Sequence, residues 1–169
     1  MDLYEFLQTV PTFSDFPQSD IEVLEKSLRA DHYPKDHVFT SEGEKDSSMY
    51  LIMQGEVQLS RKRPHDRGFE YREVLKSGDM FGLRSLIDNQ PRFSTCRAIT
   101  EVTAASLPRS AFNLLYHSHV AIAEHFQFIV AKQLSRELRA LDRALVKALT
   151  SGSLEDFLNP MPKGDDVGC

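Results

Sequence analysis

The sequence predicts a mainly β fold, an antiparallel β-roll or jelly roll, followed by one long helix. Between His37 and Leu107, short runs of β-branched and aromatic residues are separated by turn residues, as in strands joined by tight turns. From Arg109 to Ser151 the chain contains neither glycine nor proline, and apolar residues recur every three or four positions, as on one face of a helix. At 169 residues, 41% of them hydrophobic, the chain has the size of one globular domain with a buried core.

A first helix is predicted from about Asp20 to Ala30. Ser19 and Glu22 have the spacing of a capping box, in which the two side chains satisfy backbone N–H groups at the start of a helix. The apolar residues that follow share one face of this helix: Ile21, Leu24 and Leu28.

The β region divides into short runs whose spacing is typical of an antiparallel barrel or jelly roll. The predicted strands cover residues 50–53, 56–59, 71–75, 94–99 and 102–107. Cys96 lies inside one of them and is expected to be a small core residue. With Cys169 as the second of only two cysteines, the chain has too few thiols for a disulfide framework or a thiolate metal site.

A short helix around residues 111–116 is predicted to precede the long one, whose apolar stripe runs from Ile122 to Leu149. Four leucines of this stripe alternate by four and three, the spacing of a two-stranded coiled coil: Leu134, Leu138, Leu141 and Leu145. We therefore expect a homodimer through this helix, while the same seam would also fit packing on the chain's own barrel. Residues 1–149 are predicted to form the domain. Residues 150–169, acidic and containing glycine and proline, are predicted to be a disordered tail or one that orders on a partner.

The formal net charge of −5 argues against direct DNA binding, because DNA-binding chains normally present a basic face to the phosphates. The basic run at residues 61–67 is short and lies in a predicted hairpin loop, where a solvated loop is the simpler interpretation. No stretch reaches the roughly 18 consecutive apolar residues of a membrane helix, and the N-terminus does not have the pattern of a signal peptide. We expect a cytoplasmic protein without membrane contact.

The sequence contains none of the nucleophile-elbow, phosphate-loop or kinase motifs that indicate catalysis. Three histidines cluster where the long helix begins, but no acidic cluster accompanies them, so a metal site is not expected: His117, His119 and His125. The sequence therefore predicts neither an enzyme nor a bound cofactor.

The most informative segment runs from Phe81 to Thr95, with Phe-Gly-Leu-Arg-Ser at its start and Pro-Arg-Phe-Ser-Thr at its end. It resembles the phosphate-binding cassette of the cyclic-nucleotide-binding domain family, in which a strand ends in Phe-Gly-Glu, one helical turn follows, and Pro-Arg-x-Ala/Ser-Thr leads into the next strand. Further segments resemble the family in the same order: Val10–Phe13, Glu42–Glu44, Met49–Ile52, Gly55–Val57 and Leu75–Gly82. The resemblance covers residues from about 3 to 149.

The resemblance implies a ligand, cAMP or cGMP, and a set of residues that bind it. Arg92 matches the family's phosphate-binding arginine, whose planar fork suits a phosphate. Ser94 and Thr95 match the small donors beside it, and the backbone of the turn at Gly82, Arg84 and Ser85 would point at the phosphate. The sugar and base would lie against four further residues, two of them on the family's lid helix: Phe81, Leu83, Arg136 and Glu137.

One residue departs from the family pattern. Leu83 stands where the family's glutamate would accept the ribose 2′-hydroxyl, and an unpaired buried hydroxyl costs about 1–3 kcal/mol, or one to two orders of magnitude in affinity. Arg84 adds a cation that would suit a cyclic dinucleotide, or it faces water while Leu83 fills the sugar site. Two hypotheses therefore stay open. The chain is a small-molecule sensor, or, as Leu83 and the large Phe93 indicate, an interaction module that has lost its ligand.

In the family, the output depends on what the final helix is attached to. Residues 150–169 are too few for a helix-turn-helix domain, so the sequence predicts that the output is a contact with an unidentified protein partner, or that the chain is a fragment.

Overall fold

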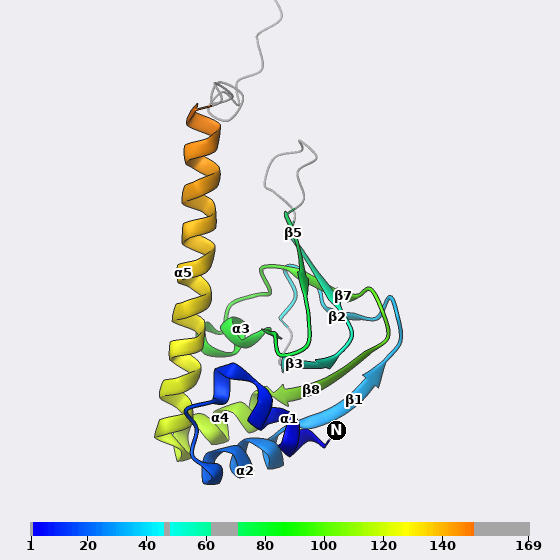
Figure 1. The fold of residues 1–169 in the computed structure, drawn as a ribbon, viewed down its shortest axis with the longest axis vertical. Helices are drawn as coiled ribbons and strands as arrows, with labels where there is room; N and C mark the ends of the chain where they lie inside the picture. Colours follow the sequence, from blue (N-terminus) through cyan, green and yellow to red (C-terminus); the bar gives the residue numbers. More distant parts are fainter. Residues whose placement is uncertain (1, 46–47, 62–70, 151–169) are drawn as a thin grey trace, which may run out of the picture. The chain divides into compact units, whose positions relative to one another are not determined.

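A computed structural model describes residues 2–45, 48–61 and 71–150. Two four-stranded antiparallel sheets form the roll (Figure 1), with strand orders β1-β8-β3-β6 and β2-β7-β4-β5. The strands follow the chain in this sequence: β1 (Arg29–Tyr33), β2 (Val38–Thr40), β3 (Ser48–Gln54), β4 (Val57–Arg61), β5 (Tyr71–Leu75), β6 (Met80–Phe81), β7 (Thr95–Ala98) and β8 (Val102–Pro108). The predicted β-roll with a C-terminal helix is therefore confirmed.

A first core lies between the two sheets and takes side chains from both of them. It exists because alternate residues of each strand are apolar and point the same way. In β4, Val57 and Leu59 are buried, and Leu59 pairs with the buried Cys96 of β7. The core also contains an aromatic group whose rings lie about 5 Å apart: Phe39, Tyr50 and Phe81. Cys96 is 2% exposed, as predicted for a small core residue.

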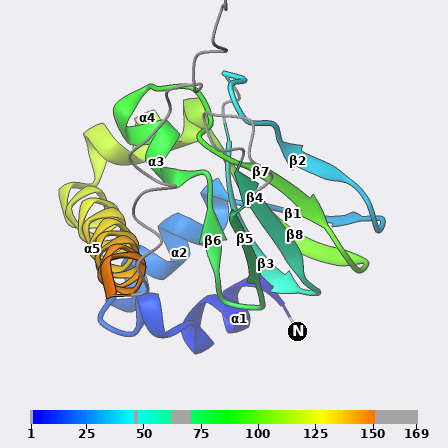
Figure 2. The ribbon, with the colours of Figure 1, turned by 90° about the horizontal axis from the view of Figure 1, so that it is seen from above.

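A second core joins the roll to the helices of residues 3–130, which gather on one side of the strands in two perpendicular views (Figures 1 and 2). Helix α5 contributes Ile122, Phe126 and Ile129, at the spacing of one helical face. The helices are α1 (Leu3–Thr9), the 3₁₀ turn η1 (Pro11–Phe13), α2 (Gln18–Ser27), α3 (Leu83–Asp88), α4 (Arg109–Ser118) and α5 (Val120–Thr150).

The first predicted helix is wrong at both ends. Helix α2 begins at Gln18 after Pro17 and ends at Ser27, so Ser19 lies inside the helix and does not cap it. Residues 29–33, whose first part was assigned to the helix, form strand β1 and pair with β8. Four of these five residues are exposed at the edge of the sheet, so their polar sequence lacks the apolar alternation that reveals a strand.

Contacts divide the chain into two units, residues 1–130 and 131–169, so that α5 begins in the first unit and continues in the second. Leu134 and Leu138 of the predicted dimer seam belong to the second unit and are 42% and 68% exposed. The side chains of Leu141 and Leu145, most of the basic run at 61–67 and the tail lie outside the described residues. The predicted domain boundary at residue 149 and the homodimer stay predictions.

Across the described ranges, no helix combines the length and the apolar character that a bilayer crossing requires. Among the same residues, no group of three or more histidine, cysteine or acidic side chains is arranged to hold a metal ion. Two of the three clustered histidines instead bind backbone carbonyls: His117 that of Asn113, and His125 that of Thr12.

Candidate functional site

Gly82 joins strand β6 to helix α3 in a conformation that favours glycine. Its φ is +84°, in the left-handed region, and it serves as the N-cap of the helix. A Cβ atom at this position would lie 2.6 Å from Nη1 of Arg92 and 2.7 Å from the carbonyl oxygen of Ser48. Both the backbone angle and the close approach of two other segments therefore require glycine here.

Arg92 is a buried cation, 4% exposed, that lies against this turn. Its Nη1 donates a hydrogen bond to the carbonyl of Gly82 at 2.7 Å, and its Nη2 donates to the carbonyl of Ser48 at the start of β3. Its own backbone exchanges hydrogen bonds with the turn before β3, because Arg92 N–H donates to Glu44 and Gly43 N–H donates to Arg92. The carbonyls of Gly82 and Ser48 thereby hold the guanidinium, and the turn at residues 43–44 holds the backbone of Arg92.

Ser94 and Thr95 follow Arg92 into β7 and connect it to the turn at residues 42–44. The hydroxyl of Thr95 accepts a hydrogen bond from the backbone N–H of Glu42 at 3.0 Å, and the carbonyl of the buried Ser94 accepts one from the hydroxyl of Thr40. Ser94 Oγ also lies 4.0 Å from Sγ of Cys96. Ser94 and Thr95 thus hold the segment that leads from Arg92 into β7 in place.

Phe81 and Leu83 flank Gly82 but belong to different cores. Phe81 lies in the core between the sheets, where its ring stacks on Tyr50 at 5.2 Å. Leu83 is 1% exposed and belongs to the core that joins the roll to the helices, together with Leu86. The side chain that replaces the family's glutamate therefore takes part in helix packing.

Arg84, at the second position of α3, is half-exposed and lies near Asp88 and Phe93. Its Nε lies 3.6 Å from Oδ2 of Asp88 one turn later, and its Cζ lies 4.8 Å from the centre of the Phe93 ring. Arg61, at the end of β4, contacts the same ring, with Cζ at 4.5 Å. The sequence predicted neither the contact between Arg84 and the Phe93 ring nor the contact between Arg61 and that ring.

Arg109 ties the cassette helix to the helical part of the first unit. Its Nη2 donates to the carbonyl of Ser85 at 3.1 Å, and its Nη1 donates to that of Leu86 at 3.4 Å. Both carbonyls belong to the last turn of α3, where the helix itself offers no N–H partner. Sequence reasoning missed Arg109 because its partners are backbone atoms more than 20 residues upstream, which no local pattern reveals.

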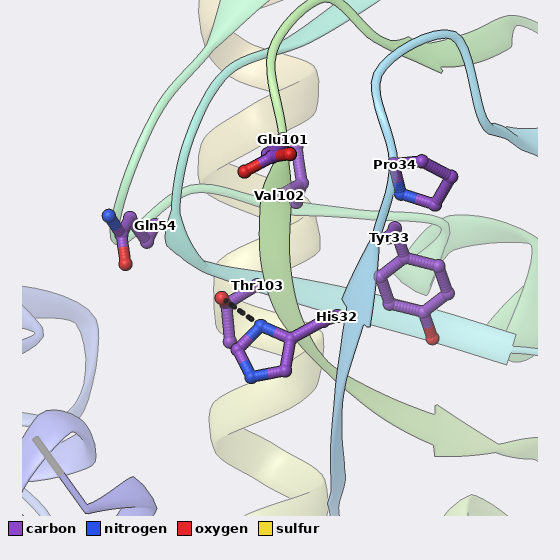
Figure 3. Close-up of a pocket in the computed structure, with 7 residues that line it drawn as sticks. All are labelled: His32, Tyr33, Pro34, Gln54, Glu101, Val102 and Thr103. Atoms are coloured by element: carbon purple, nitrogen blue, oxygen red, sulfur yellow. Dashed lines mark hydrogen bonds between the residues drawn. The ribbon is translucent and has the colours of Figure 1, made fainter.

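A cavity of about 580 Å³ lies at another part of the roll, where β1 ends and β8 begins (Figure 3). Nδ1 of His32 lies 2.8 Å from the hydroxyl oxygen of Thr103 on its wall. None of the residues predicted to bind a ligand lines this cavity, whose lining is His32, Tyr33, Pro34, Gln54, Glu101, Val102 and Thr103.

The two predicted base contacts lie on α5 in the second unit of the chain. Arg136 is exposed, and the side chain of Glu137 is outside the described residues. Their roles stay predictions. The structure brings together Gly82 and Arg92 by direct contact, and it places Arg84 and Ser85 in the first turn of α3. Ser94 and Thr95 connect the segment after Arg92 to Thr40 and Glu42.

Comparison with known proteins agrees with this architecture. The profile of the cyclic nucleotide-binding domain family matches residues 30–119, more than half of the chain. A CRP-like cAMP-activated global transcriptional regulator of Mycobacterium tuberculosis is 32% identical over 132 residues, which cover 78% of this chain and 58% of the regulator. A cAMP-dependent protein kinase regulatory subunit of Eremothecium gossypii is 32% identical over 111 residues, which cover 66% of this chain and 23% of the subunit.

Among solved structures, a cyclic nucleotide-binding domain from Methylobacillus flagellatus superposes with a TM-score of 0.71 at 24% identity, covering 86% of this chain and 82% of that domain. The chain spans less than two thirds of the length of the curated relatives it matches, and both of those relatives are regulators by name. The family profile, the roll and the cassette agree, and the chain belongs to the cyclic-nucleotide-binding domain family.

Proposed function

We propose that this chain is a non-catalytic regulatory domain that senses a cyclic nucleotide through Arg92 and the turn at Gly82–Ser85. The observation that carries the proposal is the position of Arg92. Arg92 is 4% exposed, matches the family's phosphate-binding arginine, and its guanidinium lies against the glycine turn that opens α3. A cyclic phosphate is an anion whose oxygens fit the planar fork of a guanidinium.

The contacts around Arg92 favour a preorganised site. The carbonyls of Gly82 and Ser48 orient the guanidinium before any ligand arrives, which lowers the entropic cost of binding. The hydrogen bond between Glu42 and Thr95 stiffens the neighbouring strand in the same way. With Leu83 in place of a ribose acceptor, we expect cAMP or cGMP to bind about one to two orders of magnitude more weakly than to an intact cassette.

The signal would leave the site through α3. A ligand that shifts α3 also acts on Arg109, which holds the last turn of that helix, and so on α4. We infer that the output is a contact with another protein in the cytoplasm, and that two copies associate through α5, where Leu134 and Leu138 are exposed apolar residues.

A second candidate function is an interaction module without a ligand. It is favoured by the same two carbonyls, because Arg92 is bound by the chain's own backbone, and by Leu83, which serves the helical core. In that case the cassette residues only hold the fold together.

Thermal unfolding of the full chain with cAMP and cGMP in turn separates the two functions. Ligand at a hundred times its dissociation constant adds about 2.7 kcal/mol, a rise of roughly 5–10 °C in Tm for a domain of this size. Arg92→Lys keeps the charge but loses the fork, and we expect it to remove the rise. The matched control is Arg97→Lys, on the exposed face of β7, which should keep the rise. No rise at millimolar concentrations of either nucleotide, or of a cyclic dinucleotide, would favour the interaction module.

A further inference from the structure

Two arginines from different elements converge on one aromatic ring beside Arg92. Phe93 follows Arg92 directly and is half-buried. The Cζ atom of Arg61 lies 4.5 Å from the ring centre, and that of Arg84 lies 4.8 Å from it. Two guanidiniums, one from β4 and one from α3, therefore share the ring that follows Arg92 in the chain.

The direction of Arg61 follows from the alternation of β4. Val57 and Leu59 are buried in the core between the sheets, and Arg61 lies two positions further on, on the same face of the strand. Arg97 of the neighbouring β7 is exposed, between the buried Cys96 and Ala98, and so lies on the outer face of the same sheet. Arg61 thus extends the inner face of the roll, at the end next to the cassette.

Arg61 and Arg84 bring two cationic side chains to the Phe93 ring, next to Arg92 in the chain. Arg92 by itself matches the family's partner for a single cyclic phosphate. Asp88 lies 3.6 Å from Arg84, on the side of α3, and offsets part of the charge of that side chain.

Stacking on Phe93 also suits anion recognition. A guanidinium that stacks on an aromatic ring contacts it with the flat face of the guanidinium group. The N–H donors lie in the plane of that group and point away from its centre, so they stay available to bind two phosphate oxygens. Phe93, which is larger than the residue common in the family, provides the surface that orients both forks.

We propose that Arg61 and Arg84, oriented by Phe93, form a second anion subsite beside Arg92, and that the preferred ligand carries two phosphate groups, as a cyclic dinucleotide does. The inference rests on the proposed function, because it assigns a ligand class to the same site. In this arrangement Arg92 binds one phosphate, and the Arg61–Phe93–Arg84 group binds the other.

Isothermal titration calorimetry of the full chain tests the inference with four probes: cAMP, cGMP, cyclic di-GMP and cyclic di-AMP. We expect at least one cyclic dinucleotide to bind at least tenfold more tightly than cAMP. Arg61→Gln should weaken that dinucleotide at least fivefold and change cAMP binding less than twofold. Arg84→Gln should weaken the dinucleotide at least fivefold, and more than it weakens cAMP, because Arg84 also belongs to the turn that is proposed to bind the cyclic phosphate. Arg97→Gln, which removes the same charge from the outer face, should change neither, and Arg92→Gln should weaken both.

Phe93→Leu supplies an independent variant that keeps all three charges. It should weaken binding of the dinucleotide and leave cAMP binding unchanged, because it removes only the aromatic ring that orients Arg61 and Arg84. Circular dichroism and the urea midpoint of each variant show that it is folded; where a glutamine variant is not, the lysine variant at the same position replaces it.

The outcomes are distinguishable. If cAMP binds as tightly as the dinucleotides, or if Arg61→Gln weakens cAMP as much as it weakens the dinucleotide, the second subsite is wrong while the proposed function stands. If no probe binds the unsubstituted chain, both the second subsite and the proposed function are wrong.

Discussion

The guanidinium of Arg92 donates a hydrogen bond to the carbonyl of Gly82 across 2.7 Å, in a space that a single methyl group at residue 82 would fill. The residue expected to hold the phosphate and the glycine of the turn beside it are therefore one structural unit. Any side chain at residue 82 has to displace Arg92 or Ser48 as well as strain the backbone.

Gly82→Ala is expected to destabilise the fold by about 2–4 kcal/mol, because a left-handed φ costs a non-glycine residue about 1–3 kcal/mol and the contact with Arg92 adds to it. Gly78→Ala is the matched control, since Gly78 has a φ of +89° and nothing within 4 Å of an added Cβ. Urea unfolding of both variants measures the difference. Equal losses of stability in the two variants would show that Arg92 does not approach residue 82 in solution.

Arg109→Gln is expected to loosen the last turn of α3, because it removes the donors to the carbonyls of Ser85 and Leu86. The loss in stability should be about 1–3 kcal/mol, the cost of leaving partly buried polar groups without partners. Hydrogen exchange of the peptide that covers residues 83–90 should become faster, while exchange in β3 and β8 stays slow. Arg29→Gln, on the exposed strand β1, is the control, and unchanged exchange at residues 83–90 in Arg109→Gln would contradict the link.

Leu83→Glu tests which role residue 83 has. The family resemblance alone predicts that the glutamate gains affinity for cAMP. The structure adds a cost, because Leu83 is 1% exposed in an apolar core and a carboxylate there is desolvated. We expect the unfolding free energy to fall by more than 2 kcal/mol, against less than about 1.5 kcal/mol for Leu83→Met, which keeps the volume. A glutamate variant as stable as the parent would show that residue 83 faces the ligand site.

Stability is expected to decline at alkaline pH. Burial raises the pKa of the Cys96 thiol above its usual 9.0, and burial together with Asp31 raises the pKa of Tyr33 above 10.0. The folded chain therefore holds these protons more tightly than the unfolded chain, so the stabilisation is complete below about pH 9 and is lost as the pH rises through the folded pKa values. Urea unfolding between pH 7 and 10.5 measures the decline, and Cys96→Ala should make it shallower. A free energy that stays constant over this range would contradict the burial of both groups.

Most of the roll could be predicted from the sequence, because its strands alternate apolar and polar residues. The run at 71–75 coincides with β5, and the runs at 50–53 and 102–107 lie within β3 and β8. Strand β1 was missed for the opposite reason: its exposed residues 29–32 carry no apolar pattern, and its pairing with β8 is a long-range contact.

The candidate site, like the roll, could be predicted from the sequence only in part. The cassette motif identifies Gly82 and Arg92, and the structure places them in contact. Three features could not be predicted: the carbonyl of Ser48 on Arg92, the bond from Arg109 to α3, and the approach of Arg61 to Phe93. Each joins segments that are distant in the sequence, and two of them use backbone carbonyls, which every residue has. Side-chain patterns therefore hold no signal for them.

A crystal structure of the full chain grown with millimolar cAMP tests the central claim most directly. The account predicts a nucleotide whose cyclic phosphate lies within hydrogen-bond distance of the Arg92 guanidinium, beside the Gly82 turn. A nucleotide in the cavity between His32 and Glu101, or a chain without nucleotide in which Arg92 still binds the carbonyls of Gly82 and Ser48, would contradict it.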